Sequence, residues 1–335
     1  MAQRVILHVG AMKSGTSYLQ RLLFLNRDRL ADQGVLVPGN AWPDQVRAVS
    51  EVLERKRVVA APPEGAWQGM VDEIGAASGT AVISMEFLGP AAAAKIERVV
   101  SSFPTGTVEV VVTARDLGRS IPAMWQETLK NGRFLPYDEY VAAIADRDGL
   151  GRRFWREQDV AGICERWSAA VGVDRMTLVT VPTPGAPSTL LWERFASTLG
   201  VDPAGFAEPG PTNESLGAAS AEVLRLLNER VEGMAYGEYA RKVKQQLAKR
   251  VLAKRRGEEP GVGYEPSPWL RERAGQLVEQ LRGSGIRVVG DLAELTPLAV
   301  SGARPGGLPP EEQLAAAVAA IEGLVRASGN GKSAD

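Results

Sequence analysis

The chain has little of the residues that build disulfide frameworks and histidine-rich metal sites. Its 335 residues include one cysteine, Cys164, and one histidine, His8. One cysteine excludes an internal disulfide, and one histidine excludes a metal site with several histidine ligands. No uninterrupted run of about 18 apolar residues occurs, so the sequence predicts no membrane span. A core strand is expected almost from the first residue, and we therefore expect no signal peptide and a cytoplasmic location.

The chain also lacks an excess of positive or negative charge. The 39 Lys and Arg residues nearly balance the 40 Asp and Glu residues, which gives a net charge of −1. This balance disfavours a nucleic-acid partner. A hydrophobic content of 44% and a charged content of 24% are those of a globular protein. A chain of 335 residues is long enough to bury a sizeable core.

The first residues of the chain form its most informative pattern. Residues 5–9 (Val-Ile-Leu-His-Val) are mostly branched or long apolar residues, which is typical of a buried strand in a parallel sheet. Gly10 and Gly15 then mark a tight loop, and the leucine spacing over residues 16–30 predicts a helix. Such an arrangement brings backbone N–H groups and the positive end of the helix dipole to one point. The pattern therefore predicts a site for a phosphate-type anion.

The side chains of this loop indicate which anion. Lys13 adds a positive charge, and Ser14, Thr16 and Ser17 add hydroxyl donors. In nucleotide triphosphatases the lysine directly follows the second glycine of the loop, whereas Lys13 precedes Gly15 by two residues. The order Lys-Ser-Gly-Thr-Ser instead resembles the 5′-phosphosulfate loop of the sulfotransferase family, usually K-[ST]-G-T-[ST]. The alternative is an ordinary strand–helix turn in which Ser and Thr occur by chance.

The resemblance implies a donor and a reaction. Sulfotransferases use 3′-phosphoadenosine 5′-phosphosulfate (PAPS) and release 3′,5′-ADP (PAP), with no metal. It implies that Lys13 lies beside the bridging oxygen of the donor, while Ser14, Gly15, Thr16 and Ser17 bind the 5′-phosphate. The expected acceptor is a hydroxyl or amine of a small molecule or carbohydrate. A nucleotide-dependent kinase with a divergent loop and a non-catalytic nucleotide-binding protein are the alternatives. The sequence indicates neither the identity of the acceptor nor the oligomeric state.

A second positively charged position follows the most strand-like run, residues 108–114. In sulfotransferases an arginine after this strand binds the 3′-phosphate, which implies that role for Arg115. The family places a serine eight residues later, and this chain departs from the pattern because it has Ala123 there. Arg119 or Ser120 could supply a replacement contact. A surface ion pair is the alternative for Arg115.

The general base is predicted less directly. Many sulfotransferases place a carboxylate after the strand that residues 81–85 match, which implies Glu86 as the base, whereas others use a histidine. Ligands of open α/β sheets lie outside the carboxyl ends of the strands, where Glu86 is expected. An ion pair with a neighbouring helix is its alternative role. His8 is a second catalytic candidate, but its early position favours packing or hydrogen bonding under the loop, and Glu127 is a third candidate.

Alternating strands and helices predict the fold. Strand-like runs occur at residues 5–9, 34–38, 81–86, 108–114 and 176–182. Five strands alternating with helices predict an α/β fold with a parallel sheet covered on both faces, and the resemblance implies a P-loop-type three-layer fold with a helical C-terminal half. We expect a sulfotransferase domain over residues 1–300. Residues 301–335 are expected to form a linker, one helix and a disordered tail.

Other stretches resemble a bacterial sulfotransferase subgroup between about residues 4 and 300. They are residues 125–127, 155–159, 179–182, 191–195, 213–216 and 288–292. Asn213 in one of them is the expected N-cap of a helix over 216–231. Residues 241–256 carry eight Lys or Arg and no acid, which favours a solvated helix face or a further contact to the 3′-phosphate. Trp125, Phe154 and Trp155 are expected either in the core or along an acceptor pocket.

Overall fold

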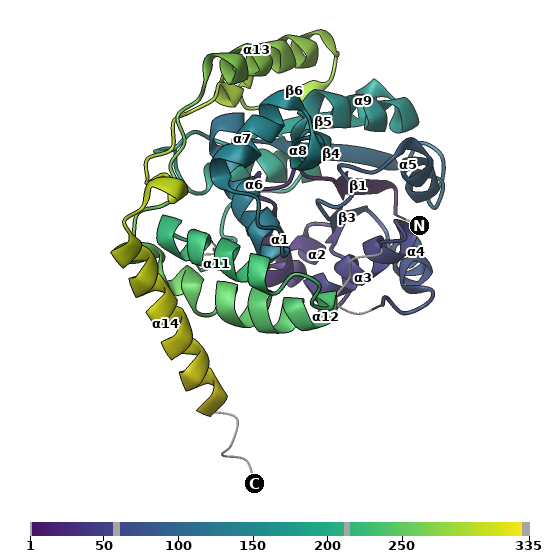
Figure 1. The fold of residues 1–335 in the computed structure, drawn as a ribbon. Helices are drawn as coiled ribbons and strands as arrows, with labels where there is room; N and C mark the ends of the chain where they lie inside the picture. The colour runs from purple at the N-terminus through teal and green to yellow at the C-terminus, as the bar shows by residue number, and fades with distance from the viewer. Residues whose placement is uncertain (1, 56–60, 211–214, 330–335) are drawn as a thin grey trace. The chain divides into compact units, whose positions relative to one another are not determined.

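A computed structural model describes residues 2–55, 61–210 and 215–329 of the chain (Figure 1). The chain divides into two compact units that are interleaved in sequence. The first consists of residues 1–117, 153–210 and 268–297, and the second of residues 118–152, 211–267 and 298–335. Residues 298–335 therefore group with two earlier segments. Asn213 and the tail from residue 330 onward lie outside the described residues.

The first unit is built on a six-stranded sheet in which every neighbouring pair is parallel, with the order β2-β3-β1-β4-β5-β6. Its strands are β1 (Arg4–His8), β2 (Val35–Leu36), β3 (Thr80–Ser84), β4 (Val108–Ala114), β5 (Met176–Thr180) and β6 (Arg287–Val289). The α/β class and the parallel sheet predicted from the sequence are confirmed. The sheet has one strand more than expected, because the three-residue β6 pairs with β5 at the edge.

Helices cover both faces of this sheet. One face packs against α3 (Trp42–Val52), α4 (Ala66–Ala76), α5 (Ala93–Val100), α9 (Val160–Val171) and the end of α13 (Pro268–Gly283). The other packs against α1 (Thr16–Leu25), α2 (Arg27–Asp32) and α10 (Leu190–Leu199). The central strand β1 explains the arrangement, since Val5 and Leu7 belong to one core cluster and Ile6 to the other. Successive side chains of a strand point to opposite faces, so a strand buried on both reads as a continuous apolar run.

The second unit is helical. All of α6 (Leu117–Lys130) except Leu117 belongs to it. Its other helices are α7 (Tyr137–Asp146), α11 (Ala218–Arg230), α12 (Tyr236–Tyr239), the π-helical segment η2 (Ala240–Lys249), the 3₁₀ segments η3 (Leu252–Gly257) and η5 (Pro305–Gly307), and α14 (Pro310–Gly329). The helix α8 (Gly149–Gln158) begins in the second unit and ends in the first. Trp125 is fully buried, and its indole N–H donates to the Leu135 carbonyl at 2.9 Å. Trp125 is therefore a core residue of this unit.

None of the helices in the described part of the chain combines the length and the apolar character needed to span a membrane.

Candidate active site

The loop between β1 and α1 has the backbone conformation that its glycines predict. Gly10, Lys13 and Gly15 adopt positive φ angles of 111°, 61° and 83°. A side chain at Gly15 would collide with Leu191, and a Cβ at Gly10 would lie 3.4 Å from the Cα and Cβ of Glu86. Left-handed backbone angles and close neighbours are both conditions that glycine tolerates best. The same contact places Glu86 directly beside the loop.

The helix that follows the loop starts without a side-chain cap. Gly15 is the N-cap residue of α1 and has no side chain to cap it, and the first turn contains no acidic residue. The N–H groups of Tyr18 and Leu19 donate to the Gly15 carbonyl. Thr16 is buried and Ser17 is exposed. The first N–H groups of a helix and its positive dipole end attract anions, and no carboxylate of the first turn competes for them here.

Beneath the loop lies a chain of buried polar side chains from three adjacent strands. His8, Ser84 and Thr113 come from β1, β3 and β4, and each is at most 1% exposed. His8 Nδ1 lies 2.7 Å from Ser84 Oγ, and His8 Nε2 lies 3.0 Å from Thr113 Oγ1. Thr113 Oγ1 also lies 2.6 Å from the hydroxyl of Ser14, which is in the loop itself. The chain therefore links the sheet to the loop.

Two hydroxyls of this chain also bond to the backbone of the loop. Ser14 Oγ donates to the Ala11 carbonyl at 2.5 Å, and Thr113 Oγ1 donates to the Gly10 carbonyl at 3.2 Å. His8 lies between the hydroxyls of Ser84 and Thr113, each of which can donate or accept. Burial lowers the pKa of His8 to about 3, which agrees with a neutral ring.

This network changes two expectations about single residues. The Ser14 hydroxyl, expected to donate to the anion, is 1% exposed and donates to the loop's own carbonyl at Ala11. The Ser14 side chain thus shapes the loop, and a contact between its backbone N–H and an anion stays a prediction. His8 is fully buried with both ring nitrogens bonded to hydroxyls, and its ring centroid lies 4.9 Å from that of Phe195. This geometry favours the supporting role over direct chemistry.

Glu86 follows β3 and is tied to the helix that the loop begins. Its Oε2 accepts a hydrogen bond of 2.7 Å from Nε2 of Gln20 on α1, and the same amide lies 3.1 Å from the Ser84 carbonyl. Gln20 is buried, whereas Glu86 is partly exposed. The hydrogen bond from Gln20 fixes the position of the Glu86 carboxylate beside the loop. The third base candidate, Glu127, lies in the second unit, where Lys244 Nζ pairs with its Oε1 at 3.2 Å.

Arg115 lies at the end of β4 and reaches the loop. Its guanidinium NH1 donates to the Lys13 carbonyl at 3.4 Å. Gln158 holds the neighbouring carbonyl of Met12, with its Nε2 at 2.8 Å. Arg115, expected to bind the 3′-phosphate of the donor, and Lys13, expected to lie beside its 5′-phosphosulfate, thus lie at the same edge of the sheet.

The replacement contacts for Ala123 lie on α6 in the second unit. Arg119 is partly exposed, as is Ala123. Ser120 is fully buried, and its hydroxyl has no hydrogen-bond partner among the described residues. The assignment of Arg119 and Ser120 to the 3′-phosphate stays a prediction. In the basic run, Lys242 pairs with Glu238 at 2.7 Å and Lys244 with Glu127.

Sequence reasoning missed the residues that support the loop, namely Ser84, Thr113, Gln20 and Gln158. For Ser84 and Thr113, the alternation of side chains along a strand could have indicated their position. Ile6, Val82 and Val111 share one core cluster, and His8, Ser84 and Thr113 each come two residues later on the same strands. A polar residue on three neighbouring strands at one period-two position predicts one buried polar layer.

In the described part of the chain, no group of three or more His, Cys, Asp or Glu is placed to hold a metal ion. Cys164 is buried, and this burial raises the pKa of its thiol to about 12, so it is not a reactive thiolate at neutral pH.

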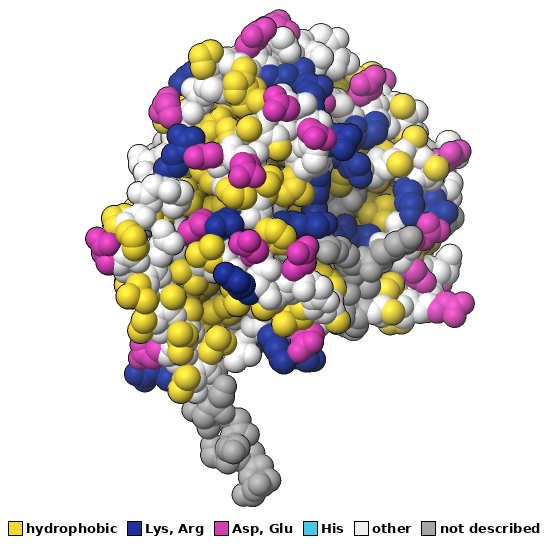
Figure 2. All heavy atoms as spheres, in the orientation of Figure 1, with side chains coloured by type: hydrophobic (Ala, Val, Ile, Leu, Met, Phe, Trp, Pro, Cys, Tyr) yellow, Lys and Arg dark blue, Asp and Glu magenta, His cyan; other side chains and the backbone are white. Residues whose placement is uncertain are grey.

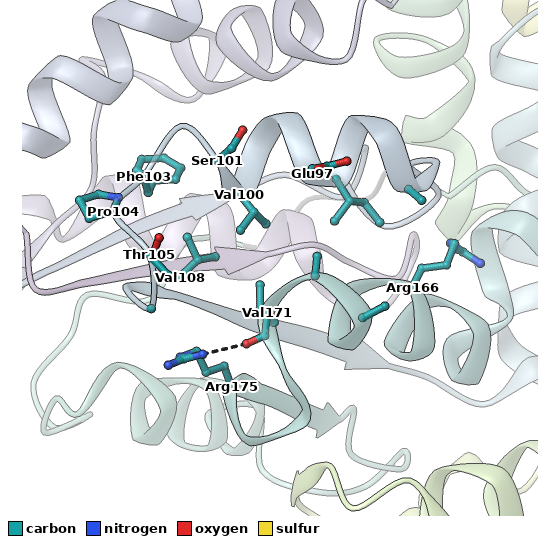
Figure 3. Close-up of a pocket in the computed structure, with 15 residues that line it drawn as sticks. Glu97, Val100, Ser101, Phe103, Pro104, Thr105, Val108, Arg166, Val171 and Arg175 are labelled. Atoms are coloured by element: carbon teal, nitrogen blue, oxygen red, sulfur yellow. Dashed lines mark hydrogen bonds between the residues drawn. The ribbon is translucent and has the colours of Figure 1, made fainter.

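A hollow lies elsewhere in the first unit. It has a volume of about 450 Å³ and lies between α5 and α9, beside the beginning of β4 (Figure 3). Apolar side chains such as Val100, Phe103 and Val171 line it, and Arg166 and Arg175 stand at its two ends. Arg175 NH1 donates to the Val171 carbonyl at 3.0 Å, so this cation is engaged by its own backbone.

Comparisons with known proteins give little. No protein-family model matches the chain, and no curated protein matches it. Among solved structures the chain is similar to a sulfotransferase from Alicyclobacillus acidocaldarius, with a TM-score of 0.42 and 16% sequence identity. The match covers 63% of this chain and 88% of that one. A match at this level leaves the argument about function with the residues themselves.

Proposed function

We propose that the chain is a PAPS-dependent sulfotransferase that transfers a sulfuryl group to a hydroxyl or amine of a small molecule or carbohydrate. One observation carries the proposal. Lys13 lies in a loop with left-handed backbone angles, and this loop ends at Gly15, the N-cap residue of α1, which has no side chain to cap the helix. The sequence of that loop has the order Lys-Ser-Gly-Thr-Ser. A helix start, a lysine and glycine backbone angles are the parts that a phosphosulfate group requires.

The donor-binding roles follow from position. The backbone N–H groups of residues 14–17 and the hydroxyls of Thr16 and Ser17 would bind the 5′-phosphate. Lys13 would neutralise the charge that develops on the oxygen between phosphorus and sulfur. Arg115, whose guanidinium reaches the Lys13 carbonyl, would bind the 3′-phosphate. Positioning and charge neutralisation supply most of the rate in transfers of this kind.

The acceptor side is assigned to Glu86. As the acceptor oxygen attacks sulfur, its proton would pass to the Glu86 carboxylate, and the bond between sulfur and the bridging oxygen would break. The electron pair of that bond stays on the 5′-phosphate of 3′,5′-ADP, where Lys13 balances it. Gln20 orients Glu86 through the 2.7 Å hydrogen bond to Oε2. General-base help of this kind contributes about 100- to 10,000-fold.

The buried chain of Ser84, His8, Thr113 and Ser14 would keep the loop in its binding conformation before the donor arrives. Every polar atom of a preformed loop that is already satisfied lowers the cost of ordering it on binding. His8 is thus a positioning residue in this proposal.

Differential stabilisation by nucleotides tests the function. A ligand stabilises a protein only when it binds the folded state, by about 2.7 kcal/mol at 100 times its Kd. We expect 3′,5′-ADP to raise the melting temperature of the wild type more than ATP with Mg²⁺ does, and to lose this effect in Lys13→Ala. Stabilisation by ATP with Mg²⁺ alone would favour a kinase.

Turnover separates the last alternative. With PAPS and a panel of hydroxyl and amine acceptors, we expect sulfated product from the wild type. Stabilisation by 3′,5′-ADP without product from any acceptor would favour a non-catalytic nucleotide-binding protein, and the departure at Ala123 is the observation behind that alternative.

A further inference from the structure

Helix α14 attaches to the second unit through small residues. Ala316 is fully buried and Ala320 is 6% exposed. A side chain at Gly323 would collide with Val251, so the helix comes close to η2 and η3 at this point. Arg255 also donates to the Ala315 carbonyl at 3.0 Å. One face of α14 is therefore fully used by contacts inside its own unit.

A different face of α14 carries four large apolar side chains in water. Leu314, Val318, Ile321 and Val325 are 64%, 56%, 62% and 65% exposed, and hydrophobic side chains run along this helix in Figure 2. They are half of the eight large hydrophobic side chains found exposed in the described residues. We call these four residues the α14 stripe. Scattered exposed hydrophobics are normal, but a contiguous row on one helix marks an interaction surface.

The spacing of the α14 stripe is that of a helix-pairing seam. Its members follow one another at intervals of four, three and four residues, the alternation that places side chains on one line of a helix. The order of these intervals is the same when the helix is followed in the opposite direction. In an antiparallel pair of α14 helices, Leu314 therefore lies opposite Val325 of the second copy, and Val318 lies opposite its Ile321. Each apolar side chain meets another, and the two-fold axis passes near residues 319 and 320.

The charges of α14 favour this orientation. Glu311 and Glu312 are exposed in its first turn, and near its end Arg326 pairs with Glu322 of the same helix at 2.7 Å. An antiparallel pair keeps the first-turn glutamates of the two helices apart and places them near the end of the other helix, where Arg326 lies. A parallel pair would place the glutamates together. Exposed alanines such as Ala315 leave room for a second helix to approach closely.

We propose that the α14 stripe is the seam of a homodimer, in which α14 of one chain pairs antiparallel with α14 of a second copy. The interface is isologous, so one patch supplies both sides and the assembly closes at two chains. The proposal rests on the second unit and is independent of the reaction assigned to the loop.

Sedimentation analysis of the full chain tests the dimer. We expect a wild-type mass of twice 35.8 kDa at micromolar concentration. Val318→Glu, at the centre of the stripe, should give the monomer mass with unchanged thermal unfolding of the separate chain, since its side chain is 56% exposed. The matched control is Val173→Glu, which places the same charge at another exposed valine and should leave the dimer intact. A monomeric wild type, or a dimer unaffected by Val318→Glu, overturns the proposal.

Cross-linking tests the orientation. Cys164 is buried and does not interfere. The combined variant Leu314→Cys and Val325→Cys should form a disulfide-linked dimer in mild oxidant, whereas Leu314→Cys alone should not. Efficient cross-linking through the single Leu314→Cys overturns the antiparallel arrangement.

Charge reversal gives a second reading of the orientation. Arg326→Glu should weaken the dimer at least several-fold. Glu311→Arg and Glu312→Arg added to that variant should restore it. An unchanged dimer in Arg326→Glu, or the absence of restoration, contradicts the charge arrangement proposed for the seam.

Discussion

The two edges of the first unit's sheet differ in what gathers there: polar and charged side chains at one edge, and a hollow at the other. At the edge where the strands end, the loop of residues 9–15 lies over a buried polar chain with Lys13, Glu86 and Arg115 beside it. At the edge where the strands begin, a hollow of about 450 Å³ is lined mostly by apolar side chains. This hollow thus lies at the opposite edge of the sheet from Lys13, Glu86 and Arg115.

The difference follows from how parallel sheets are built. Every strand of the sheet runs the same way, so all the loops that leave the strands gather at one edge together with the starts of the following helices. Free N–H groups and positive dipole ends collect there. The opposite edge receives helix C-termini, whose carbonyls already hold cations such as Arg175. We therefore expect an anion site at the edge where the strands end rather than in the hollow.

Removing the lysine of the loop should give the largest contrast between the edges. Lys13→Ala removes the charge that we propose balances the departing oxygen, and we expect kcat to fall about 1,000-fold. Arg175→Ala removes a cation from the hollow at the other edge and should leave kcat within twofold. Steady-state kinetics with PAPS measures both, and equal losses in the two variants would contradict the placement of the chemistry.

The two carboxylates give the next contrast. Glu86→Gln keeps the size of the side chain and its place beside Gln20, but it cannot take a proton. We expect kcat to fall about 100-fold with little change in the KM for PAPS. Glu97→Gln at the hollow should have no effect on either constant. A fully active Glu86→Gln would assign the base to another group.

The arginine of the carboxyl edge should act on donor binding. Arg115→Ala removes charged hydrogen bonds worth about 1.5–3 kcal/mol, so the KM for PAPS should rise about 10- to 100-fold. Arg115→Lys should fall between the wild type and Arg115→Ala, because lysine keeps the charge without the planar fork. A donor titration of the three proteins is the measurement. An unchanged KM in Arg115→Ala would remove this residue from the donor site.

The buried polar chain should contribute to stability. Thr113→Val keeps the shape but leaves His8 Nε2 and the Ser14 hydroxyl without their shared partner. Burial of unpaired polar groups costs about 1–3 kcal/mol in free energy of unfolding. Thr105→Val, at an exposed position of the hollow, should change the stability by no more than about 0.5 kcal/mol. Urea unfolding compares the two, and equal midpoints would show that Thr113 holds nothing in place.

The smallest expected effect is a pH dependence of stability that comes from His8. Its pKa of about 3 in the folded state lies below the value of about 6.5 in an unfolded chain. The unfolded state therefore binds more protons below pH 6.5, and stability is complete above that pH and falls as the pH decreases. The loss should reach about 1–2 kcal/mol at pH 5.

A variant without the titrating ring isolates that slope. His8 is the sole histidine of the chain, so His8→Asn should remove the part of the pH dependence between pH 6.5 and 5, whatever its stability at neutral pH. Parallel stability curves for the two proteins would show that the ring does not stay neutral in the folded state.

Much of the edge where the strands end could be predicted from the sequence, because the patterns that specify it lie within short segments of the chain. The apolar run of residues 5–9 and the positions of Gly10 and Gly15 are enough for a strand, a loop and a helix. The sequence does not predict β6, because this strand has three residues and gains its place by pairing with β5. The polar chain under the loop joins residues about 100 positions apart, such as Ser14 and Thr113. Such contacts depend on strand order, which no single segment of the chain contains.

The most direct test of the central claim is a crystal structure of the chain with 3′,5′-ADP bound. We predict that its 5′-phosphate lies against the backbone N–H groups of residues 14–17 with Lys13 Nζ within hydrogen-bonding distance, and that its 3′-phosphate contacts Arg115. Nucleotide bound in the hollow between α5 and α9, or a loop left empty at saturating ligand, would contradict the account.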